Sequence, residues 1–263
     1  MANAVLETDN KTNEEMDMEK KQLEQTLVLI KPDALKNSLT GYVLSQLSEF
    51  HTGLRFAGAK IVYVSRILAQ EHYAEHIGKP FFASLQEYIR GEIHYPDNPM
   101  RRRVIAFVYQ GEDAIQKIRN IAGPTNSHVA RDTKPGSIRA LGTVVTIKDE
   151  TGKEIGDRLD NLVHASANLE DAEREIKLWF KPSDIPPLMR AYPTEVSTEY
   201  FYFKNDKLYT AYEPDSICFV APGAIVWKSD LDALHLIAKG QPAPVSLASV
   251  VAKYTINHEV ESE

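Results

Sequence analysis

The segment NLVHASAN at residues 161–168 runs directly into LEDAEREIKLWF at 169–180, and the architecture of the chain can be predicted outward from this point. Leu162 and Val163 form an apolar pair that is too short for a helix and suits a short buried strand. The small residues that follow leave room around a reacting group. The sequence therefore predicts a strand that delivers one histidine, His164, to the beginning of a helix.

The second half of this stretch predicts an amphipathic helix. Asn168 is a good N-cap. The apolar residues after it share one helix face: Leu169, Ala172, Ile176 and Phe180. Glu175 lies at the margin of that face, where its carboxylate can turn back toward the strand. A histidine nucleophile needs such a carboxylate to fix the ring and select the attacking nitrogen. His164 is thus a candidate nucleophile, and a hydrogen-bonded structural histidine is the alternative.

Composition and charge limit the class of protein. A chain of 263 residues with 43% apolar and 25% charged residues suits one large domain or two small ones. The formal net charge of -7 argues against a general affinity for nucleic acid or anionic membranes, although it leaves room for a local basic pocket. Cys218 is the only cysteine, which excludes an intramolecular disulfide and favours a reducing, cytoplasmic location. Residues 1–24 lack the apolar segment of a secretory signal or membrane anchor, and we predict a mobile or weakly helical tail.

From Thr26 onward, regular elements can be predicted. They are a buried strand at 26–30, a helix at 40–50, a strand at 54–64, short helices around 71–76 and 81–89, a buried strand at 104–109 and a helix at 112–121. Residues 123–141 contain Pro124 and Pro135 and are predicted to form a long loop. A loop of this length in a compact domain is usually functional or disordered.

Six segments of the chain, taken in order, resemble the nucleoside diphosphate kinase family. They are TLVLIKPDA at 26–34, EHY at 71–73 with KPFF at 79–82, Arg119 with Thr125-Asn126, KPGSIR at 134–139, NLVHAS at 161–166 and EREIKLWF at 173–180. Each segment alone is a weak signal, whereas six in this order are specific. The resemblance covers residues from about 25 to 185 and implies a ferredoxin-like βαββαβ domain, an α+β fold whose antiparallel sheet is backed by helices.

The resemblance implies a phosphotransferase that works through a phosphohistidine. His164 would take the γ-phosphoryl group of a nucleoside triphosphate and pass it to a nucleoside diphosphate in a second half-reaction, which is a ping-pong scheme. Neutral imidazole is available as a nucleophile near pH 7. By the same resemblance, Glu175 orients the ring, Ser166 supports that carboxylate and Tyr73 lies beside the histidine.

Phosphoryl transfer also requires positive charge around the transferred group. The resemblance assigns this charge to Lys31, Arg119 and Arg139, and it counts Lys31 among the catalytic residues. The further nucleotide contacts that it implies are the hydroxyl of Thr125 on a phosphate, Asn161 with Lys31 on the ribose, the ring of Phe81 on the base, and Leu85 as the apolar neighbour of that ring. Mg²⁺ is the expected cofactor, bridging the phosphates and not held in an all-protein cage. The expected partners are nucleoside tri- and diphosphates and further copies of the chain, because the family is homo-oligomeric.

The chain departs from the family pattern in three places. After His164 the family usually has Gly-Ser-Asp-Ser, whereas this chain has Ala165, Ser166, Ala167 and Asn168. A Cβ is therefore added beside the nucleophile, and a carboxylate is missing. Residues 92–103 exceed the family's tight turn, and we expect part of the chain to project there. Residues 143–160 contain an insertion whose alternating pattern and glycine turn predict a hairpin. This hairpin displaces the residue that would close over the second face of the base.

Residues 186–263 match no family pattern and begin among prolines that mark a domain boundary. We predict β-hairpins over 198–212 and 217–227, a short helix from Ser229 to Ala238 and a further element at 247–252. A mostly β extension this small and aromatic is expected to dock on the 25–185 domain or on a neighbouring subunit.

Two alternatives to an enzyme follow from this extension. The chain could be a non-catalytic kinase-like scaffold, or a nucleotide-binding regulator that uses the extension. The joint presence of His164, Lys31 and Glu175 favours the enzyme.

Overall fold

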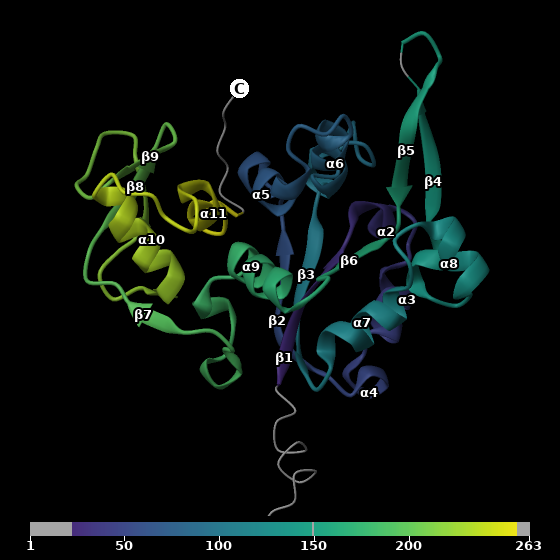
Figure 1. The fold of residues 1–263 in the computed structure, drawn as a ribbon, viewed down its shortest axis with the longest axis horizontal. Coiled ribbons are helices and arrows are strands. Elements are labelled where there is room, and N and C mark those ends of the chain that lie inside the picture. Colours follow the sequence, from purple (N-terminus) through teal and green to yellow (C-terminus); the bar gives the residue numbers. More distant parts are fainter. Residues whose placement is uncertain (1–22, 149, 257–263) are drawn as a thin grey trace, which may run out of the picture.

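The computed structural model describes residues 23–148 and 150–256 (Figure 1). Most of the segment predicted as a tail lies outside the described residues, and Glu24 already belongs to the first strand.

A four-stranded antiparallel sheet forms the centre of the molecule (Figure 1). Its strands are β1 Glu24–Ile30, β2 Arg55–Val62, β3 Val104–Gly111 and β6 Val163–Ala165, in the order β2-β3-β1-β6. β1 and β3 occupy the middle because they are nearly continuous apolar runs and need burial on both faces. The predicted α+β fold with an antiparallel sheet is confirmed.

Helices cover both faces of this sheet. One face lies under α5 Arg66–His72 and α9 Leu169–Trp179, and the other under α2 Pro32–Lys36, α3 Thr40–Gln46 and α7 Ala114–Ala122. Side chains alternate along a strand. Because Val163 and Ala165 of β6 enter the core with α2, α3 and α7, His164 points to the opposite face, toward α5 and α9.

The other helices of this domain are short and lie in its connections. They are α4 Glu49–Thr52, α6 Phe82–Ile89, α8 Ser127–Thr133 and the 3₁₀ turns η1 Ala74–His76, η2 Pro99–Arg101, η3 Ile138–Leu141, η4 Pro182–Asp184 and η5 Pro187–Met189. The helix predicted at 40–50 is two helices, because Ser48 caps a separate α4. The long loop predicted at 123–141 is wrong, since α8, capped by Asn126, and η3 fill most of it. Within the described ranges, no helix has both the length and the apolar character needed to cross a bilayer.

The two departures from the family's loop lengths take different forms. β4 Thr143–Lys148 and β5 Glu154–Asp160 form the predicted hairpin, which extends away from the sheet (Figure 1). In the segment 92–103, residues 96–100 are exposed as expected. The part before them turns inward and buries His94, which is 7% exposed.

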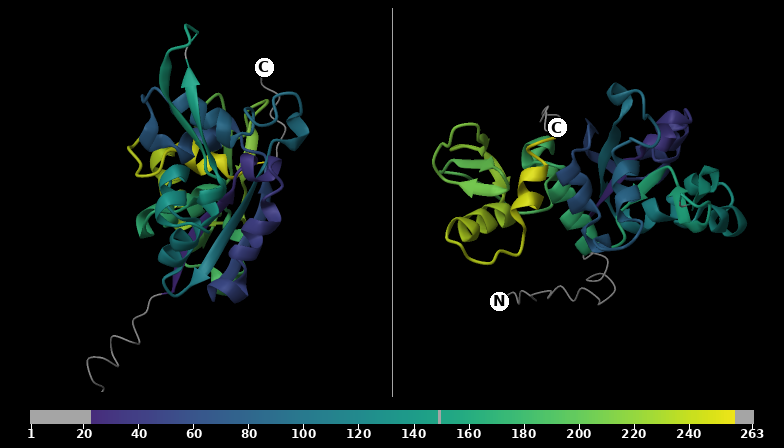
Figure 2. Two further views of the ribbon diagram at one scale, coloured as in Figure 1. Left: turned by 90° about the vertical axis from the view of Figure 1, so that its right-hand side faces the viewer. Right: turned by 90° about the horizontal axis from the view of Figure 1, so that it is seen from above.

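Residues after 193 form small sheets and two helices at one end of the molecule (Figure 2). Their elements are β7 Thr194–Val196, β8 Phe201–Lys204, β9 Lys207–Tyr209, β10 Ile217–Val220, β11 Ile225–Trp227, α10 Lys228–Ala238 and α11 Leu247–Ala252. The first predicted hairpin is confirmed as β8-β9. The second is wrong, because β10 pairs with β8 and β11 pairs with β7. Ser229 does not cap α10, whose N-cap position is Trp227.

This C-terminal segment shares a core with the sheet domain. Trp227 is fully buried in the same apolar cluster as Trp179 of α9, and its indole N–H donates to the backbone oxygen of Phe180 at 2.8 Å. α11 packs against α5, where Ser246 Oγ donates to Glu71 Oε2 at 3.0 Å. The segment therefore covers the two helices that lie on the His164 side of the sheet.

Candidate active site

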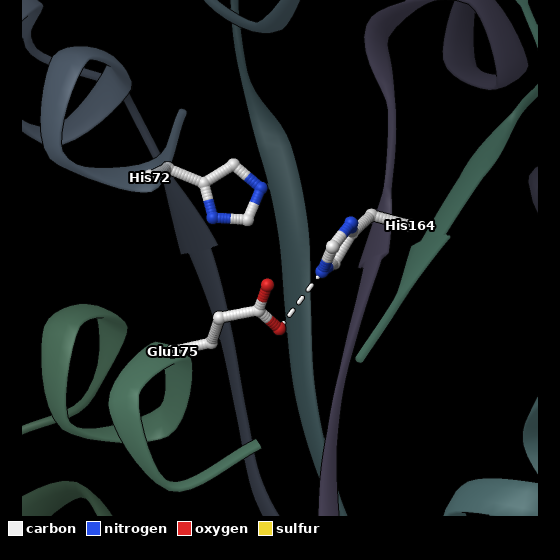
Figure 3. A group of neighbouring side chains, drawn as sticks. All are labelled: His72, His164 and Glu175. Carbon is white, nitrogen blue, oxygen red and sulfur yellow. Dashed lines mark hydrogen bonds and ion pairs between the residues drawn. The ribbon is translucent and has the colours of Figure 1, made fainter. Parts of the chain in front are cut away.

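His164 is held by a carboxylate where β6 leads into α9 (Figure 3). Its Nε2 lies 2.9 Å from Glu175 Oε2, and Ser166 Oγ donates to the same carboxylate oxygen at 2.6 Å. Ser166 Oγ itself accepts from the backbone N–H of Leu27 at 3.1 Å. Asn168 caps α9 as predicted, which fixes where the helix begins and so places Glu175 opposite the strand.

The carboxylate distinguishes the two ring nitrogens of His164. Burial by itself would raise the pKa of Glu175, but His164 beside it and the hydrogen bond between them hold that pKa at about 2. Glu175 is therefore only an acceptor, so Nε2 of His164 carries a proton and Nδ1 of the neutral ring keeps its lone pair. In this arrangement the available nucleophilic atom is Nδ1.

A second histidine, His72 at the end of α5, lies against His164. The two ring centroids are 4.6 Å apart with their planes at 79°, and His72 is 3% exposed. Burial, followed by the proximity of His164, lowers the pKa of His72 well below its usual value, so this ring is neutral.

The side chains of His72, His164 and Glu175 form a cluster whose spacing is also found in metal sites. Ligand-type atoms of His72, His164 and Glu175 lie within 4.8 Å of one another (Figure 3). The indole N–H of Trp179 donates to His72 Nδ1 at 3.3 Å. Because an indole can only donate, the proton of neutral His72 must be on Nε2, and neither nitrogen of that ring has a free lone pair for a metal. The cluster therefore fits a histidine–carboxylate pair with a neutral ring packed beside it.

Lys31 lies just after β1 and is 7% exposed. Its Nζ donates to Asn161 Oδ1 at 2.7 Å, and Asn161 Nδ2 donates to the backbone oxygen of Thr125 at 2.9 Å. The same Nζ is 4.9 Å from the centre of the Tyr88 ring. Burial lowers the pKa of Lys31 to about 8, against the opposing effect of Asp33. The structure thus joins Lys31, Asn161 and the loop that contains Thr125.

The turn at 160–162, between β5 and β6, is strained. Leu162 is buried and has a φ of 71°, in the left-handed region. This region costs a residue with a Cβ about 1–2 kcal/mol. The N–H of Leu162 donates to Asp33 Oδ2 at 2.9 Å, and its carbonyl accepts from the N–H of Lys31 at 2.9 Å. These bonds hold the turn and bring Asn161 to Lys31.

Two guanidinium groups lie near each other beside β6. Arg139 is 5% exposed and donates to the backbone oxygens of Val163 and Gly123. Burial, followed by the nearby charge of Arg119, lowers the pKa of Arg139 to about 10. Two positive charges this close together favour the binding of an anion.

The remaining predicted site residues are Tyr73, Phe81, Leu85 and Thr125. Burial, with the carboxylates of the site, raises the pKa of Tyr73. Phe81 is 44% exposed, Leu85 is half-buried on α6, and Thr125 is exposed. In the part of the chain that the structure describes, no hydrogen bond connects these four side chains to His164.

The sequence did not single out every residue of the site. The structure adds Asp33, His72, His94, Arg158 and Asp160. His72 and Asp160 adjoin the predicted site residues Tyr73 and Asn161 in the chain, and Asp33 lies two positions after Lys31, so their positions are a signal. His94 and Arg158 come from segments outside the family pattern, where nothing local pointed to the site.

The fold, together with the buried cations beside a histidine–carboxylate pair, indicates a phosphotransferase that handles nucleotides. A family profile described as nucleoside diphosphate kinase matches residues 24–185, and the chain belongs to that family. The resemblance seen in the sequence is therefore confirmed for this part of the chain. The match ends before the C-terminal segment.

Similar proteins agree with this assignment. The nucleoside diphosphate kinase of Thermococcus kodakarensis is 38% identical over 168 residues, covering 64% of this chain and 83% of that protein. The one from Pyrococcus abyssi is 38% identical over 182 residues, covering 69% and 96%. The crystal structure of the Aquifex aeolicus nucleoside diphosphate kinase has 32% identity and a TM-score of 0.50, covering 63% of this chain and 100% of that chain. A transition state mimic of the Borrelia burgdorferi enzyme, with bound vanadate and ADP, has 31% identity and a TM-score of 0.50, covering 64% and 94%.

Proposed function

We propose that this protein is a nucleoside diphosphate kinase that transfers the γ-phosphoryl group of a nucleoside triphosphate to a nucleoside diphosphate through a phosphohistidine at Nδ1 of His164. The observation that carries the proposal is the 2.9 Å contact between His164 Nε2 and Glu175 Oε2, because it leaves Nδ1 as the free nucleophile. Ser166 holds the same carboxylate, so the ring is oriented before a substrate binds.

The chemistry takes two half-reactions. In the first, the lone pair of Nδ1 attacks the γ-phosphorus, and the bond from that phosphorus to the oxygen bridging the β- and γ-phosphates breaks. The nucleoside diphosphate leaves with the electron pair, and the Nε2 proton of the phosphorylated ring stays hydrogen-bonded to Glu175. In the second, a terminal oxygen of another nucleoside diphosphate attacks the phosphorus and the N–P bond breaks. His164 returns to neutral imidazole, which gives a ping-pong cycle.

The charges of the site suit this substrate. Lys31, Arg119 and Arg139 supply positive charge where the phosphate oxygens lie in the transition state. The Borrelia burgdorferi relative was solved with ADP and vanadate, which supports a nucleotide site in this chain as well. The other roles in the proposal are Thr125 on a phosphate, Asn161 with Lys31 on the ribose, Phe81 on the base, Leu85 beside that ring and Tyr73 beside His164.

Mg²⁺ fits this site as an ion carried by the nucleotide. Glu175, Asp33 and Asp160 are buried carboxylates that already accept hydrogen bonds from the protein. The groups left for the phosphates are cations, which suit phosphate oxygens and not a bare metal ion. Mg²⁺ bound to the phosphates would neutralise part of their charge.

The hydrogen bonds that link His164, Glu175 and Ser166 favour an enzyme over a scaffold or a regulator, because a scaffold or a regulator does not need an oriented nucleophile. We also propose a homo-oligomer, on the family resemblance alone, and sedimentation velocity of the full chain tests this assembly.

A labelling experiment tests the activity. The full chain, incubated with Mg²⁺ and ATP labelled in the γ-phosphate, should give a phosphoprotein that is labile in acid and stable in base. His164→Asn should abolish both the label and the transfer to other nucleoside diphosphates, while nucleotide binding is retained. His51→Asn is the matched control, since His51 is exposed on α4, and it should keep full activity. Label that persists in the His164 variant refutes the proposal.

A further inference from the structure

The two segments that depart from the family pattern meet next to the Lys31–Asn161 pair. His94 Nε2 lies 2.9 Å from Asp160 Oδ2, and Arg158 donates to the two oxygens of Asp160 at 2.7 and 3.1 Å. His94 and Asp160 are each 7% exposed. A buried carboxylate with a histidine on one side and a bidentate guanidinium on the other has a strongly specified orientation.

These partners also settle the charge of Asp160. Burial by itself would raise its pKa, but the hydrogen bonds from His94 and Arg158 outweigh burial and hold that pKa at about 2. Asp160 is therefore an acceptor, and His94 Nε2 is the donor. The His94 ring also lies 5.2 Å from the ring of Tyr88, the same ring that has Lys31 Nζ over it. His94 thus contacts Asp160, which precedes Asn161 in the chain, and Tyr88, whose ring lies under the Lys31 ammonium group.

The position of His94 matters because the turn at 160–162 is strained. Asp33 holds one end of this turn through the N–H of Leu162, whose φ is 71°. Asp160 is the other end, and His94 and Arg158 hold it. With both ends fixed, Asn161 is kept at 2.7 Å from Lys31 Nζ.

We propose that His94 is a positioning residue for the sugar of the nucleotide. It acts through Asp160 and Tyr88 and keeps Asn161 and Lys31 in the geometry that receives the ribose hydroxyls. The inference rests on the proposed function, which assigns the sugar to this pair. Loss of His94 should weaken sugar recognition more than phosphate binding, because Arg119 and Arg139 belong to α7 and η3, and the Arg139 guanidinium donates to Val163 and Gly123 and not to residues 160–162.

The test compares equilibrium binding of ADP and 2′,3′-dideoxyADP to the full chain. His94→Phe keeps a ring against Tyr88 and removes the donor to Asp160. The preference of the protein for ADP over the dideoxy analogue should fall about tenfold, the effect of one hydrogen bond to a charged group, while binding of the analogue changes little. His94→Gln can still donate to Asp160 and should keep most of the preference. His51→Phe, the same exchange at an exposed histidine, should leave both affinities unchanged.

Two results overturn the inference. One is a folded His94→Phe protein that keeps the ADP preference of the wild type. The other is an equal loss of affinity for both ligands, which is what a purely structural role gives. Where His94→Phe does not fold, Asp160→Asn takes its place, because it keeps the shape of the side chain and should also lose the preference.

Binding needs no reaction at His164, so the two proposals can fail separately. A wild-type protein that prefers ADP in this His94-dependent way but forms no phosphohistidine refutes the proposed function and supports the inference. A wild-type protein that binds neither nucleotide refutes both.

Discussion

The ammonium group of Lys31 loses its proton at a lower pH than an exposed lysine, because it is buried at the end of β1. With a pKa of about 8, it is charged at neutral pH and becomes neutral as the pH rises through that value. The pH dependence of kcat/KM reports groups of the free enzyme. For nucleoside diphosphates, kcat/KM should therefore be level near neutral pH and fall above about pH 8, as a rate profile extended to about pH 9.5 would show.

Arginine at the same position gives the matched comparison. Lys31→Arg stays charged over this range and should lose the alkaline fall. Its rate should be lower throughout, because a guanidinium cannot reproduce the single bond from Nζ to Asn161. Lys36→Arg, at an exposed position in the last turn of α2, should keep the wild-type profile. A wild-type profile that stays level beyond about pH 9 would separate Lys31 from nucleotide binding.

Among the elements, the β4–β5 hairpin approaches the strained turn so closely that position 142 has room only for glycine. A Cβ on Gly142 would lie 2.5 Å from the carbonyl oxygen of Asp160 and 2.5 Å from Ser127 Oγ. Gly142→Ala should push the base of the hairpin away from the turn and lower the free energy of unfolding by about 1–3 kcal/mol. Urea unfolding of the variant and the wild type measures this change.

A second glycine serves as the control for this substitution. A Cβ on Gly41 in α3 would have nothing within 4 Å, and alanine favours a helix. Gly41→Ala should therefore leave stability unchanged or raise it by about 0.5–1 kcal/mol. A Gly142→Ala protein as stable as the wild type would show that the hairpin base can move without cost.

The elements that could be predicted from the sequence are those with local signals. β6 and α9 were predicted together because an apolar pair, a cap and a helical repeat follow one another along the chain. α8 was missed because Ser127 and Ala130 are its only buried residues, which leaves no apolar repeat to detect.

The second C-terminal hairpin shows the limit of turn chemistry. Pro222 and Gly223 do form a turn, with a φ of 86° at Gly223 and a hydrogen bond from the N–H of Ala224 to the oxygen of Ala221 at 3.0 Å. The strands on either side nevertheless pair with β8 and β7. A turn depends on its own residues, whereas the choice of strand partner depends on distant ones.

In the candidate site, too, some residues could be predicted from the sequence, whereas the contacts between distant segments could not. The local pattern at 161–180 led to His164 and Glu175, and the family resemblance added Ser166; the structure joins all three by hydrogen bonds. The bond between His94 and Asp160 could not be predicted, because it connects residues 66 positions apart in two segments that lie outside the family pattern.

For the whole molecule, Trp227 is one of the residues that connect the C-terminal segment with the sheet domain. It is fully buried with Trp179 and donates to the backbone oxygen of Phe180 at 2.8 Å. Trp227→Ala should leave a cavity and an unpaired carbonyl, and lower the free energy of unfolding by about 3–5 kcal/mol. Denaturant titration measures this cost.

The control for Trp227 is an aromatic residue of the same segment that does not enter this core. Tyr212 is 67% exposed, and Tyr212→Ala should change stability by no more than about 0.5 kcal/mol. A Trp227→Ala cost below about 1 kcal/mol would mean that the segment folds as an independent module, and would favour the regulator over a simple enzyme.

The shared core also determines when a newly made copy can finish folding. Trp227 and Ala252 belong to the cluster that contains Leu27 of β1, so this core can be completed only after α11 has left the ribosome. Translation adds about 5–20 residues per second, which leaves the sheet domain without part of its covering for several seconds. During that interval the apolar side chains around Trp179 are open to chaperones and to neighbouring nascent chains. A polypeptide released before α11 is made would keep part of this apolar cluster exposed and would be a target for proteases.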